Sequence, residues 1–221
     1  MACWSAENAT KAYLKTLKMG QSGKEPNVNE FVSALAAGNN AQLMVVTCTG
    51  AANATSTILA LVAAAHQTRG RLVCILPGEE QLRLLEKVLG HDVYRVEFVI
   101  GEAQNLLLTH YRAADFVLID CNLENHQGIL RAVQESCRRR FNGAVVVGYN
   151  AFSGGSWRSG GSKTQLLPIG NGLLVTRITG SGSAGTGNLG KKSQWIVRVD
   201  KCTGEEHVFR VRFPQGKEIP A

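Results

Sequence analysis

Asp120 is the residue whose type and position are best suited to carry chemistry. It closes the apolar run 115–120, DFVLID, which has the pattern of a buried strand. A carboxylate at a strand end can act as a general base or hold a ligand hydroxyl group. It can equally accept hydrogen bonds from backbone donors where the next helix begins. The residues alone leave both roles open.

A second candidate is the small-residue turn 47–53, TCTGAAN, between the apolar run 43–48 and a helix-like apolar segment. Gly50 lacks a side chain, so the backbone there could approach a nucleotide-like ligand closely. The same small residues would also let a helix pack tightly on a sheet. The turn is therefore either a ligand site or a structural element.

The spacing of the other reactive side chains excludes several classes of site. No C-x-x-C pair and no histidine at zinc-ligand spacing occurs, which predicts reduced thiols without a metal. The serines in the loop 150–163 lack the strand–turn–helix elbow of a serine nucleophile. The six cysteines stand singly, at Cys3, Cys48, Cys74, Cys121, Cys137 and Cys202.

Alternating strands and helices position these residues. After two N-terminal helices at 5–18 and 28–37, short apolar strands alternate with longer helices. This alternation predicts a doubly wound, mostly parallel α/β sheet with helices on both faces. We expect strands at 43–48, 71–76, 95–100, 115–120 and 143–149, and helices at 53–66, 79–89, 103–111 and 123–140.

The pattern changes after residue 149. A loop rich in glycine and serine over 150–163 precedes two antiparallel strands, 164–169 and 173–179, joined by a Gly-Asn-Gly turn. We expect one Rossmann-like domain over residues 1–179, a flexible glycine- and serine-rich linker over 180–193 and a basic β-hairpin over 194–213. The strand pair at 164–179 could lie at a sheet edge and support a homodimer.

The excess of positive charge in the 221-residue chain lies entirely in its C-terminal third. Residues 1–137 hold 11 Lys and Arg against 13 Asp and Glu, whereas residues 138–221 hold 13 against 4. Such a region could bind the phosphates of a nucleic acid, or only keep the surface soluble. The sequence starts without a basic segment leading into an apolar one, and no apolar run reaches about 18 residues. We therefore expect no membrane association and a cytoplasmic protein, with a nuclear location also open.

Four segments, taken in order, resemble the metal-dependent class I O-methyltransferases of the caffeoyl-CoA type. They are IGEAQNLL (100–107), FVLIDCNLEN (116–125), VVVGYNAFSGGSW (145–157) and LPIGNGLLVTRI (167–178). The whole chain, with its opening WSAENATKAYLKTLK, resembles a plant family of methyltransferase-like proteins of uncharacterised activity. The resemblance implies the seven-stranded Rossmann-like sheet of class I methyltransferases and S-adenosylmethionine as the cofactor.

The resemblance also implies a cofactor site, from which this sequence departs in two places. Only Gly50 is kept of the glycine-rich turn after the first strand, and the acid that should close that strand is missing. Leu76 and Pro77 stand where a carboxylate should bind the ribose hydroxyls. Glu79 follows slightly later, where the helix dipole alone would explain an acid. The cofactor-binding candidates are Thr47, Thr49, Gly50, Glu79, Gly101, Glu102, Ala103 and Asp120.

The metal site implied by the resemblance is also changed. That family binds a divalent cation through an aspartate closing the fourth strand and an Asp-Asn pair closing the fifth. Asp120 matches the first, but the pair is replaced by Asn150 and Ala151. Lost charge and lost ligands predict no metal and no metal-dependent catechol methylation.

We therefore interpret the chain as an S-adenosylmethionine-dependent methyltransferase-like protein with altered motifs. It would be a pseudoenzyme, or a binder of S-adenosylmethionine or a related nucleoside. One alternative is a nucleic-acid or protein interaction module that uses the basic C-terminal region. Another is an active, metal-independent O-methyltransferase acting on a small metabolite, with Asp120 as the catalytic base.

Overall fold

The computed structural model describes residues 4–19, 27–154, 157, 162–180, 193–199 and 206–212. Its contacts divide the chain into two compact units, Met1–Ser183 and Ala184–Ala221. No helix among the described residues combines the length and the apolar character that a membrane crossing requires.

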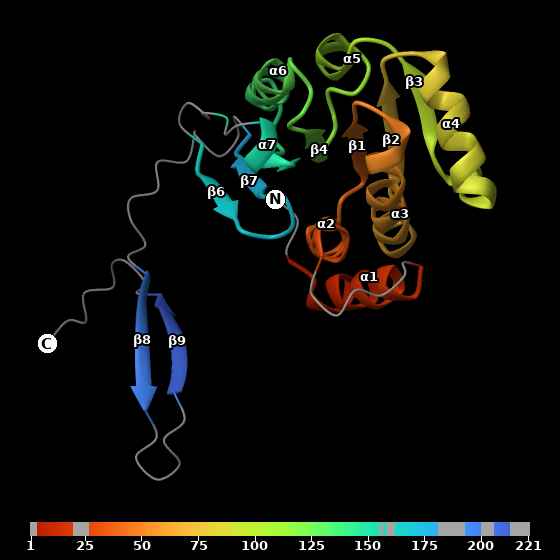
Figure 1. The fold of residues 1–221 in the computed structure, drawn as a ribbon. Helices are drawn as coiled ribbons and strands as arrows, with labels where there is room; N and C mark the ends of the chain where they lie inside the picture. Colours follow the sequence, from red (N-terminus) through yellow and green to blue (C-terminus); the bar gives the residue numbers. More distant parts are fainter. Residues whose placement is uncertain are drawn as a thin grey trace, which may run out of the picture. The chain divides into compact units, whose positions relative to one another are not determined.

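The first unit alternates helices and strands in the predicted order (Figure 1). Its elements are α1 (Ala6–Met19), α2 (Val28–Gly38), β1 (Leu43–Thr47), α3 (Ala51–Thr68), β2 (Arg71–Leu76), α4 (Glu79–Leu89), the 3₁₀ helix η1 (Gly90–Arg95), β3 (Glu97–Ile100), α5 (Ala103–Thr109), β4 (Phe116–Asp120), α6 (His126–Arg138), β5 (Ala144–Tyr149), α7 (Ala151–Gly154), β6 (Thr164–Leu167) and β7 (Leu173–Ile178).

Seven strands form one sheet in the order β3-β2-β1-β4-β5-β7-β6. The strands β1 to β5 pair in parallel, and β7 runs antiparallel between β5 and β6. The chain starts at β1, moves outward to β3, and then returns to the other side of β1 with β4. The order of strands therefore reverses between β1 and β4, where ligands of open α/β sheets commonly bind. The predicted doubly wound, mostly parallel α/β fold is confirmed.

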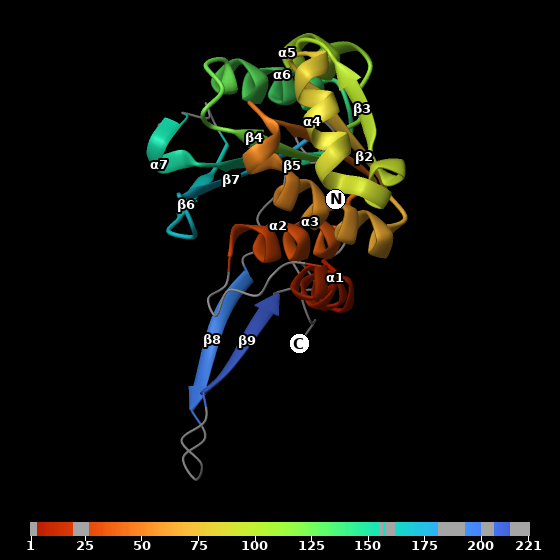
Figure 2. The same cartoon turned by 45° about the vertical axis from the view of Figure 1, so that its right-hand side comes forward.

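Helices cover both faces of this sheet, α5 and α6 one face and α2, α3 and α4 the other, as Figures 1 and 2 show. Alternate strand residues enter two separate cores. Met44 and Val46 of β1 join the core under α2, α3 and α4, while Val45 joins the core under α5 and α6. This alternation follows from the two-residue period of a strand. The helix α1 packs on α2 and α3.

Side chains fix the places where elements begin. At the start of α2, the Asn27 side chain accepts a hydrogen bond from the Asn29 backbone, and Glu30 accepts one from the Asn27 backbone. These two contacts form a capping box, which satisfies backbone donors at the helix start.

Several predicted boundaries were wrong. The predicted strand 95–100 begins only at Glu97, because Gly90–Arg95 closes into the 3₁₀ helix η1. The predicted helix 123–140 begins at His126, because the Leu123 backbone N–H first turns back to the carbonyl of Asp120, at 3.1 Å. This turn keeps Asp120 at the edge of the sheet.

The second unit contains the predicted hairpin, formed by β8 (Ser193–Val199) and β9 (Glu206–Arg212), which pair antiparallel. Residues 181–192 of the predicted linker lie outside the described residues. The domain limits drawn from the sequence stay a prediction.

Candidate functional site

Asp120 lies at the carboxyl end of β4 and is fully buried. Its Oδ2 accepts a hydrogen bond from Thr49 Oγ1 at 2.8 Å. Its Oδ1 accepts two, from the Asn122 backbone N–H and from Asn150 Nδ2, both at 3.0 Å. The carboxylate thus joins the ends of β1, β4 and β5 and satisfies three donors. A buried charge is tolerated only when such hydrogen bonds compensate its lost hydration.

Asn150 occupies the place where the resemblance expects an acidic metal ligand. Its backbone lies in the left-handed region with φ 60°, which asparagine adopts more readily than most residues. The side chain presents its amide nitrogen, a donor, to Asp120. The following turn is held by the β6–β7 connection, since the Ala151 N–H donates to the carbonyl of Gly172 at 3.1 Å.

A cavity of about 170 Å³ opens beside this cluster, at the carboxyl ends of β1, β2 and β3. Four of the predicted cofactor residues line it: Thr47, Gly101, Glu102 and Ala103. Gly101 has φ 157°, a conformation that disfavours residues with a side chain. The turn after β3 therefore needs glycine at this place, and it forms one wall of the cavity.

The other walls of this cavity are apolar side chains with two amides. Ile75, Leu76 and Ile129 contribute apolar surface. Asn125 Nδ2 donates to Gln104 Oε1 at 2.9 Å, so the two amides are held together at the rim. Flat apolar walls with a few fixed polar groups are suited to a planar, weakly polar ring.

The remaining predicted cofactor residues do not line this cavity. Glu79 begins α4, faces Arg83 at 3.6 Å and is largely exposed. Gly50 caps α3 with an extended backbone, φ −174°, which any residue can adopt. Thr49 and Asp120 bind each other next to the cavity. Among the described residues, the end of β2 offers Leu76 and Pro77 to the cavity and no carboxylate.

Buried thiols surround the same sheet edge. Cys74 lies beside Cys48, and the pKa of its thiol is raised, first by the hydrogen bond between the two thiols and then by burial. Burial, followed by the charge of Asp120, raises the pKa of Cys121 to about 12. These groups are protonated at neutral pH, so they are poor nucleophiles and poor metal ligands.

The sequence analysis missed a second cavity at the carboxyl edge, of about 420 Å³. Five asparagines line it: Asn27, Asn29, Asn122, Asn150 and Asn171. They come from segments that are distant in sequence, so their convergence left no local pattern to detect.

Three hydroxyl-bearing residues, Ser56, Thr57 and Tyr149, complete the polar lining of this second cavity. Tyr149 ends β5 and is buried, with its Oη shielded from solvent and close to the carboxylate of Asp120. Burial and then the charge of Asp120 raise the pKa of the phenol. The phenol is therefore neutral at ordinary pH. The Tyr149-Asn150 pair at a strand end was the one available signal.

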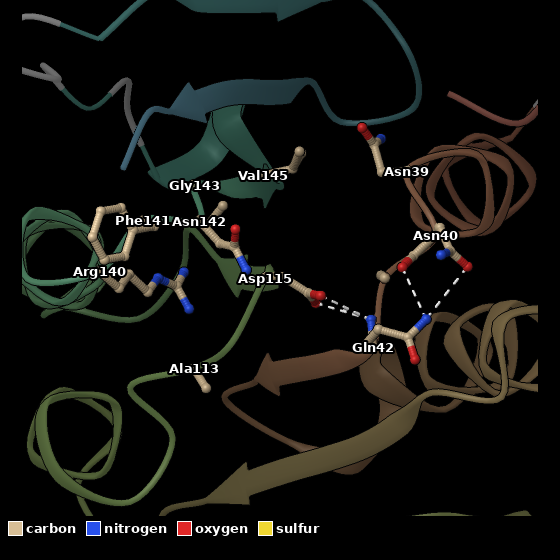
Figure 3. A pocket seen from close by; sticks show the side chains of 12 residues that line it. Asn39, Asn40, Gln42, Ala113, Asp115, Arg140, Phe141, Asn142, Gly143 and Val145 are labelled. Carbon is tan, nitrogen blue, oxygen red and sulfur yellow. Dashed lines mark hydrogen bonds between the residues drawn. The ribbon is translucent and has the colours of Figure 1, made fainter. Parts of the chain in front are cut away.

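A third cavity, of about 700 Å³, lies at the opposite, amino edge of the sheet (Figure 3). The carboxylate of Asp115 there accepts the backbone N–H groups of Gln42 and Leu43 at 2.9–3.2 Å. Arg140 and Phe141 lie on the far side of Asp115 from Gln42. Arg140 Nη2 donates to the carbonyl of Ala114. These contacts tie the starts of β1 and β4 together, which is a structural role.

Comparison with known proteins identifies the fold. The family described as "Protein of unknown function (DUF1442)" matches residues 1–211. A methyltransferase from Geobacter sulfurreducens is similar in structure, with a TM-score of 0.51, 19% identity, and coverage of 79% of this chain and 91% of that chain. A candidate caffeoyl-CoA O-methyltransferase from Staphylococcus aureus has a TM-score of 0.54 and 13% identity, and the match covers 79% of this chain and 93% of that chain. The S-adenosylhomocysteine-bound methyltransferase PaMTH1 of Podospora anserina has a TM-score of 0.51 and 12% identity, and the match covers 80% of this chain and 90% of that chain.

No curated protein sequence is significantly similar to this chain. At these identities the structural likeness shows the fold alone. The predicted class I methyltransferase fold, of the type found in the caffeoyl-CoA O-methyltransferases, is therefore confirmed, and the activity has to be argued from the site.

Proposed function

The chain belongs to the DUF1442 family, and from that premise we propose that it is a methyltransferase-like protein that binds an adenine nucleoside without catalysing metal-dependent methylation. S-adenosylmethionine and S-adenosylhomocysteine are the first ligands to test. The observation that carries this proposal is the 170 Å³ cavity at the carboxyl ends of β1, β2 and β3, bounded by the left-handed turn at Gly101.

The residues present fit one part of such a ligand. The apolar walls from Ile75, Leu76 and Ile129 suit the faces of an adenine ring, and the amides of Gln104 and Asn125 suit its polar edge. No carboxylate ends β2 to hold the ribose hydroxyls. We therefore expect binding that depends mainly on the base and is weaker than a complete site would give.

The residues around Asp120 do not fit a divalent cation. Hard cations such as Mg²⁺ need several oxygen ligands, and usually more than one carboxylate. Asp120 already receives three donors, and Asn150 presents a nitrogen instead of an oxygen. Among the described residues, no group of three or more His, Cys, Asp or Glu could hold a metal. We derive no catalytic step through a metal.

Calorimetry tests the proposal with S-adenosylmethionine, S-adenosylhomocysteine and adenosine as separate titrants. We expect dissociation constants in the micromolar to submillimolar range, roughly the same for all three because the base dominates. Added Mg²⁺ or EDTA should leave them unchanged. Absence of binding heat at millimolar ligand would show that the proposal is wrong.

Two variants in which leucine replaces alanine test where the ligand binds. Ala103→Leu adds volume at the wall of the cavity and should weaken binding at least tenfold. Ala113→Leu makes the same change at an exposed site on the amino edge and should leave binding unchanged. Equal affinity in both variants would exclude this cavity as the binding site.

A metal-independent methyltransferase with Asp120 as the base is the competing interpretation. The burial of Asp120 and its three hydrogen bonds argue against this interpretation, because a base must reach the proton that it removes. Single-turnover assays with isotopically labelled S-adenosylmethionine would detect any methyl transfer. If transfer occurred and Asp120→Asn left its rate unchanged, Asp120 would not be that base. Plant origin, an intracellular location and a homodimer stay predictions from the sequence.

A further inference from the structure

Basic residues gather at the amino edge of the sheet, where the parallel strands β1 to β5 begin. Parallel strands begin at the same edge, so the residues that precede them lie along one side of the first unit. The register brings two further segments there, because Arg177 near the end of β7 pairs with Val145, and Thr164 at the start of β6 pairs with Thr176. The exposed basic residues at this edge are Arg69, Arg71, Arg95, Arg112, Arg138, Arg139, Lys163 and Arg177.

The carboxyl edge carries charge of the opposite sign. Among the described residues, its turns hold no Lys or Arg and contain the acids Glu79, Glu80, Glu102, Asp120 and Glu124. The acids at the amino edge are fewer than its basic residues, and they are Asp92, Glu97, Asp115 and Glu135. The first unit therefore presents an excess of positive charge along its amino edge.

Ion pairs neutralise only part of this excess. Glu97 lies 2.6 Å from Arg71, and Glu135 lies 2.9 Å from Arg139. Exposed pairs of this kind are weak, so their arginines remain able to contact a phosphate group. Arg69, Arg112 and Lys163 form no ion pair with any described residue. The edge can therefore attract a polyanion.

The 700 Å³ cavity lies in the middle of this edge, at the starts of β1, β4 and β5 (Figure 3). Four amides line it: Asn39, Asn40, Gln42 and Asn142. The one carboxylate in its lining, that of Asp115, already accepts hydrogen bonds from two backbone N–H groups. The cavity therefore offers neutral hydrogen-bonding groups in the centre of a basic surface.

Phe141 is the second observation that points to a ligand. It lines the same cavity directly after the run Arg138, Arg139 and Arg140, and it is 85% exposed. An exposed phenylalanine contributes little to folding, because it removes little apolar surface from water. Its ring is free to stack on a planar group of a ligand. An exposed aromatic ring among arginines and amides is the combination that binds unpaired bases.

The amino edge offers a separate contact for each part of a nucleic-acid strand. Arginines can hold the phosphates, the ring of Phe141 can stack on a base, and the cavity amides can bond to base edges. We infer that this edge of the first unit binds single-stranded nucleic acid, with one base on Phe141. The seven strands, spaced about 4.8 Å apart, extend the edge over about 29 Å, which accommodates several nucleotides.

Fluorescence anisotropy on the full chain tests the inference with labelled strands of about 20 nucleotides. The probes are oligouridine, oligothymidine, a DNA duplex and an abasic DNA strand. We expect micromolar affinity for at least one single strand at about 50 mM salt, falling about fiftyfold at 200 mM if about four phosphates are neutralised. The duplex and the abasic strand should bind at least tenfold more weakly, because neither presents a free base to Phe141. No binding of any single strand, or equal binding of the abasic strand, would overturn the inference.

Two phenylalanine variants test the stacking contact. Phe141→Ala should weaken binding of the single strand at least fivefold, the effect of one lost base stack. It should leave binding of the abasic strand unchanged. Phe152→Ala removes another exposed ring, 59% exposed on α7 at the carboxyl edge, and should leave both affinities unchanged. If Phe141→Ala bound the single strand as tightly as the wild type, the stacking contact would be refuted.

Two arginine variants test the charged contact with equal changes of net charge. Arg112→Gln, at the amino edge, should weaken binding at about 50 mM salt and reduce the salt slope by about 0.7. Arg131→Gln removes an exposed charge from the middle of α6 and should change neither quantity. Equal effects of the two variants would mean that net charge alone drives binding, which contradicts a specific surface.

This inference goes beyond the nucleoside proposal and does not depend on it. The basic edge and the 170 Å³ cavity lie at opposite ends of the strands and share no residue. Titration of Phe141→Ala with S-adenosylhomocysteine should therefore give the wild-type affinity. If this variant lost both ligands, the two surfaces would not be independent, and the placement of the strand at the amino edge would be wrong.

Discussion

At the scale of single residues, Asp120 is the common acceptor for three structural segments. Thr49, Asn122 and Asn150 each donate to it, and its side chain is shielded from water. A carboxylate in this position holds the strand ends together, whatever ligand binds nearby. Its presence alone is therefore weak evidence of catalysis.

Asp120→Ala should consequently reduce the free energy of unfolding by about 3 kcal/mol, because it leaves buried donors without an acceptor. Asp120→Asn retains one acceptor oxygen and should cost about 1–2 kcal/mol. Urea denaturation measures both. Glu124→Ala, on the exposed surface of the same turn, is the control and should change stability by less than about 0.5 kcal/mol. A fully stable Asp120→Ala protein would contradict this structural role.

The buried phenol of Tyr149 predicts a loss of stability at high pH. In the folded protein its pKa is raised, first by burial and then by the charge of Asp120. The unfolded phenol ionises near pH 10, so above that pH the unfolded state binds fewer protons than the folded state. Stability should therefore fall as pH rises, by about 1.4 kcal/mol per pH unit from this group.

Urea denaturation between about pH 8 and pH 11 measures this fall. The free energy of unfolding should fall less steeply with pH in Tyr149→Phe, because unfolding of this variant releases one proton fewer. Tyr94→Phe is the matched control, because Tyr94 is 90% exposed, and its slope should equal that of the wild type. Identical slopes in the wild type and in Tyr149→Phe would mean that the phenol ionises as readily in the folded protein as in the unfolded one.

At the scale of elements, the sequence predicted what depends on local pattern. The limits of β2 (Arg71–Leu76) and α4 (Glu79–Leu89) agree with the prediction, because a mostly apolar run and an amphipathic helix that ends at a glycine can be recognised from the local sequence. The start of α6 was missed by three residues, because the turn after β4 is set by contacts with Asp120.

The candidate site was harder to predict than the fold for the same reason. The turn at Gly101 could be predicted because the three consecutive residues Gly101, Glu102 and Ala103 form it, and all three line the cavity. The polar cavity needs α2, the turn after β4, the end of β5 and the β6–β7 turn to meet in space. Only the folded chain shows that Asn27 and Asn171 line one cavity with Tyr149.

The contact of Trp157 with β5 shows how the loop after β5 is anchored. Trp157 is buried, and its Nε1 donates to Thr176 Oγ1 at 3.1 Å. Gly148 makes room for it, since a Cβ at residue 148 would lie 2.7 Å from Trp157 Cζ3 and 2.8 Å from Cys121 Sγ. Trp157 is therefore a core residue.

Gly148→Ala should cost about 1–3 kcal/mol of unfolding free energy, because the added methyl group overpacks this contact. Trp157→Phe alone should also destabilise, by leaving space and by removing the hydrogen bond to Thr176. The double variant should lose less than the sum of the two, since the smaller ring accommodates the methyl group. Additive losses in this double-mutant cycle would indicate that the two positions do not interact.

At the scale of the whole molecule, the net positive charge is divided between the two compact units: Met1–Ser183 holds 17 Lys and Arg against 13 Asp and Glu, and Ala184–Ala221 holds 7 against 4. Residues 138–221 carry 13 Lys and Arg against 4 Asp and Glu. The compact unit Met1–Ser183 contains the seven-stranded sheet, and the unit Ala184–Ala221 contains the hairpin of β8 and β9. Ligand binding at the sheet and any nucleic-acid binding by the unit Ala184–Ala221 should therefore be separable.

Removing residues 184–221 tests this separation. The truncated protein should keep the unfolding midpoint and the nucleoside affinity of the full chain, because the sheet and both carboxyl-edge cavities lie within Met1–Ser183. If the unit Ala184–Ala221 alone binds nucleic acid, the full chain should bind a single-stranded RNA or DNA probe with an affinity that falls steeply with salt, and the truncated chain should not. Fluorescence anisotropy at about 50 and 200 mM salt measures both proteins. Equal nucleic-acid binding by the two proteins would exclude the C-terminal unit as the binding surface, whereas a lower unfolding midpoint after truncation would show that the two units are energetically coupled.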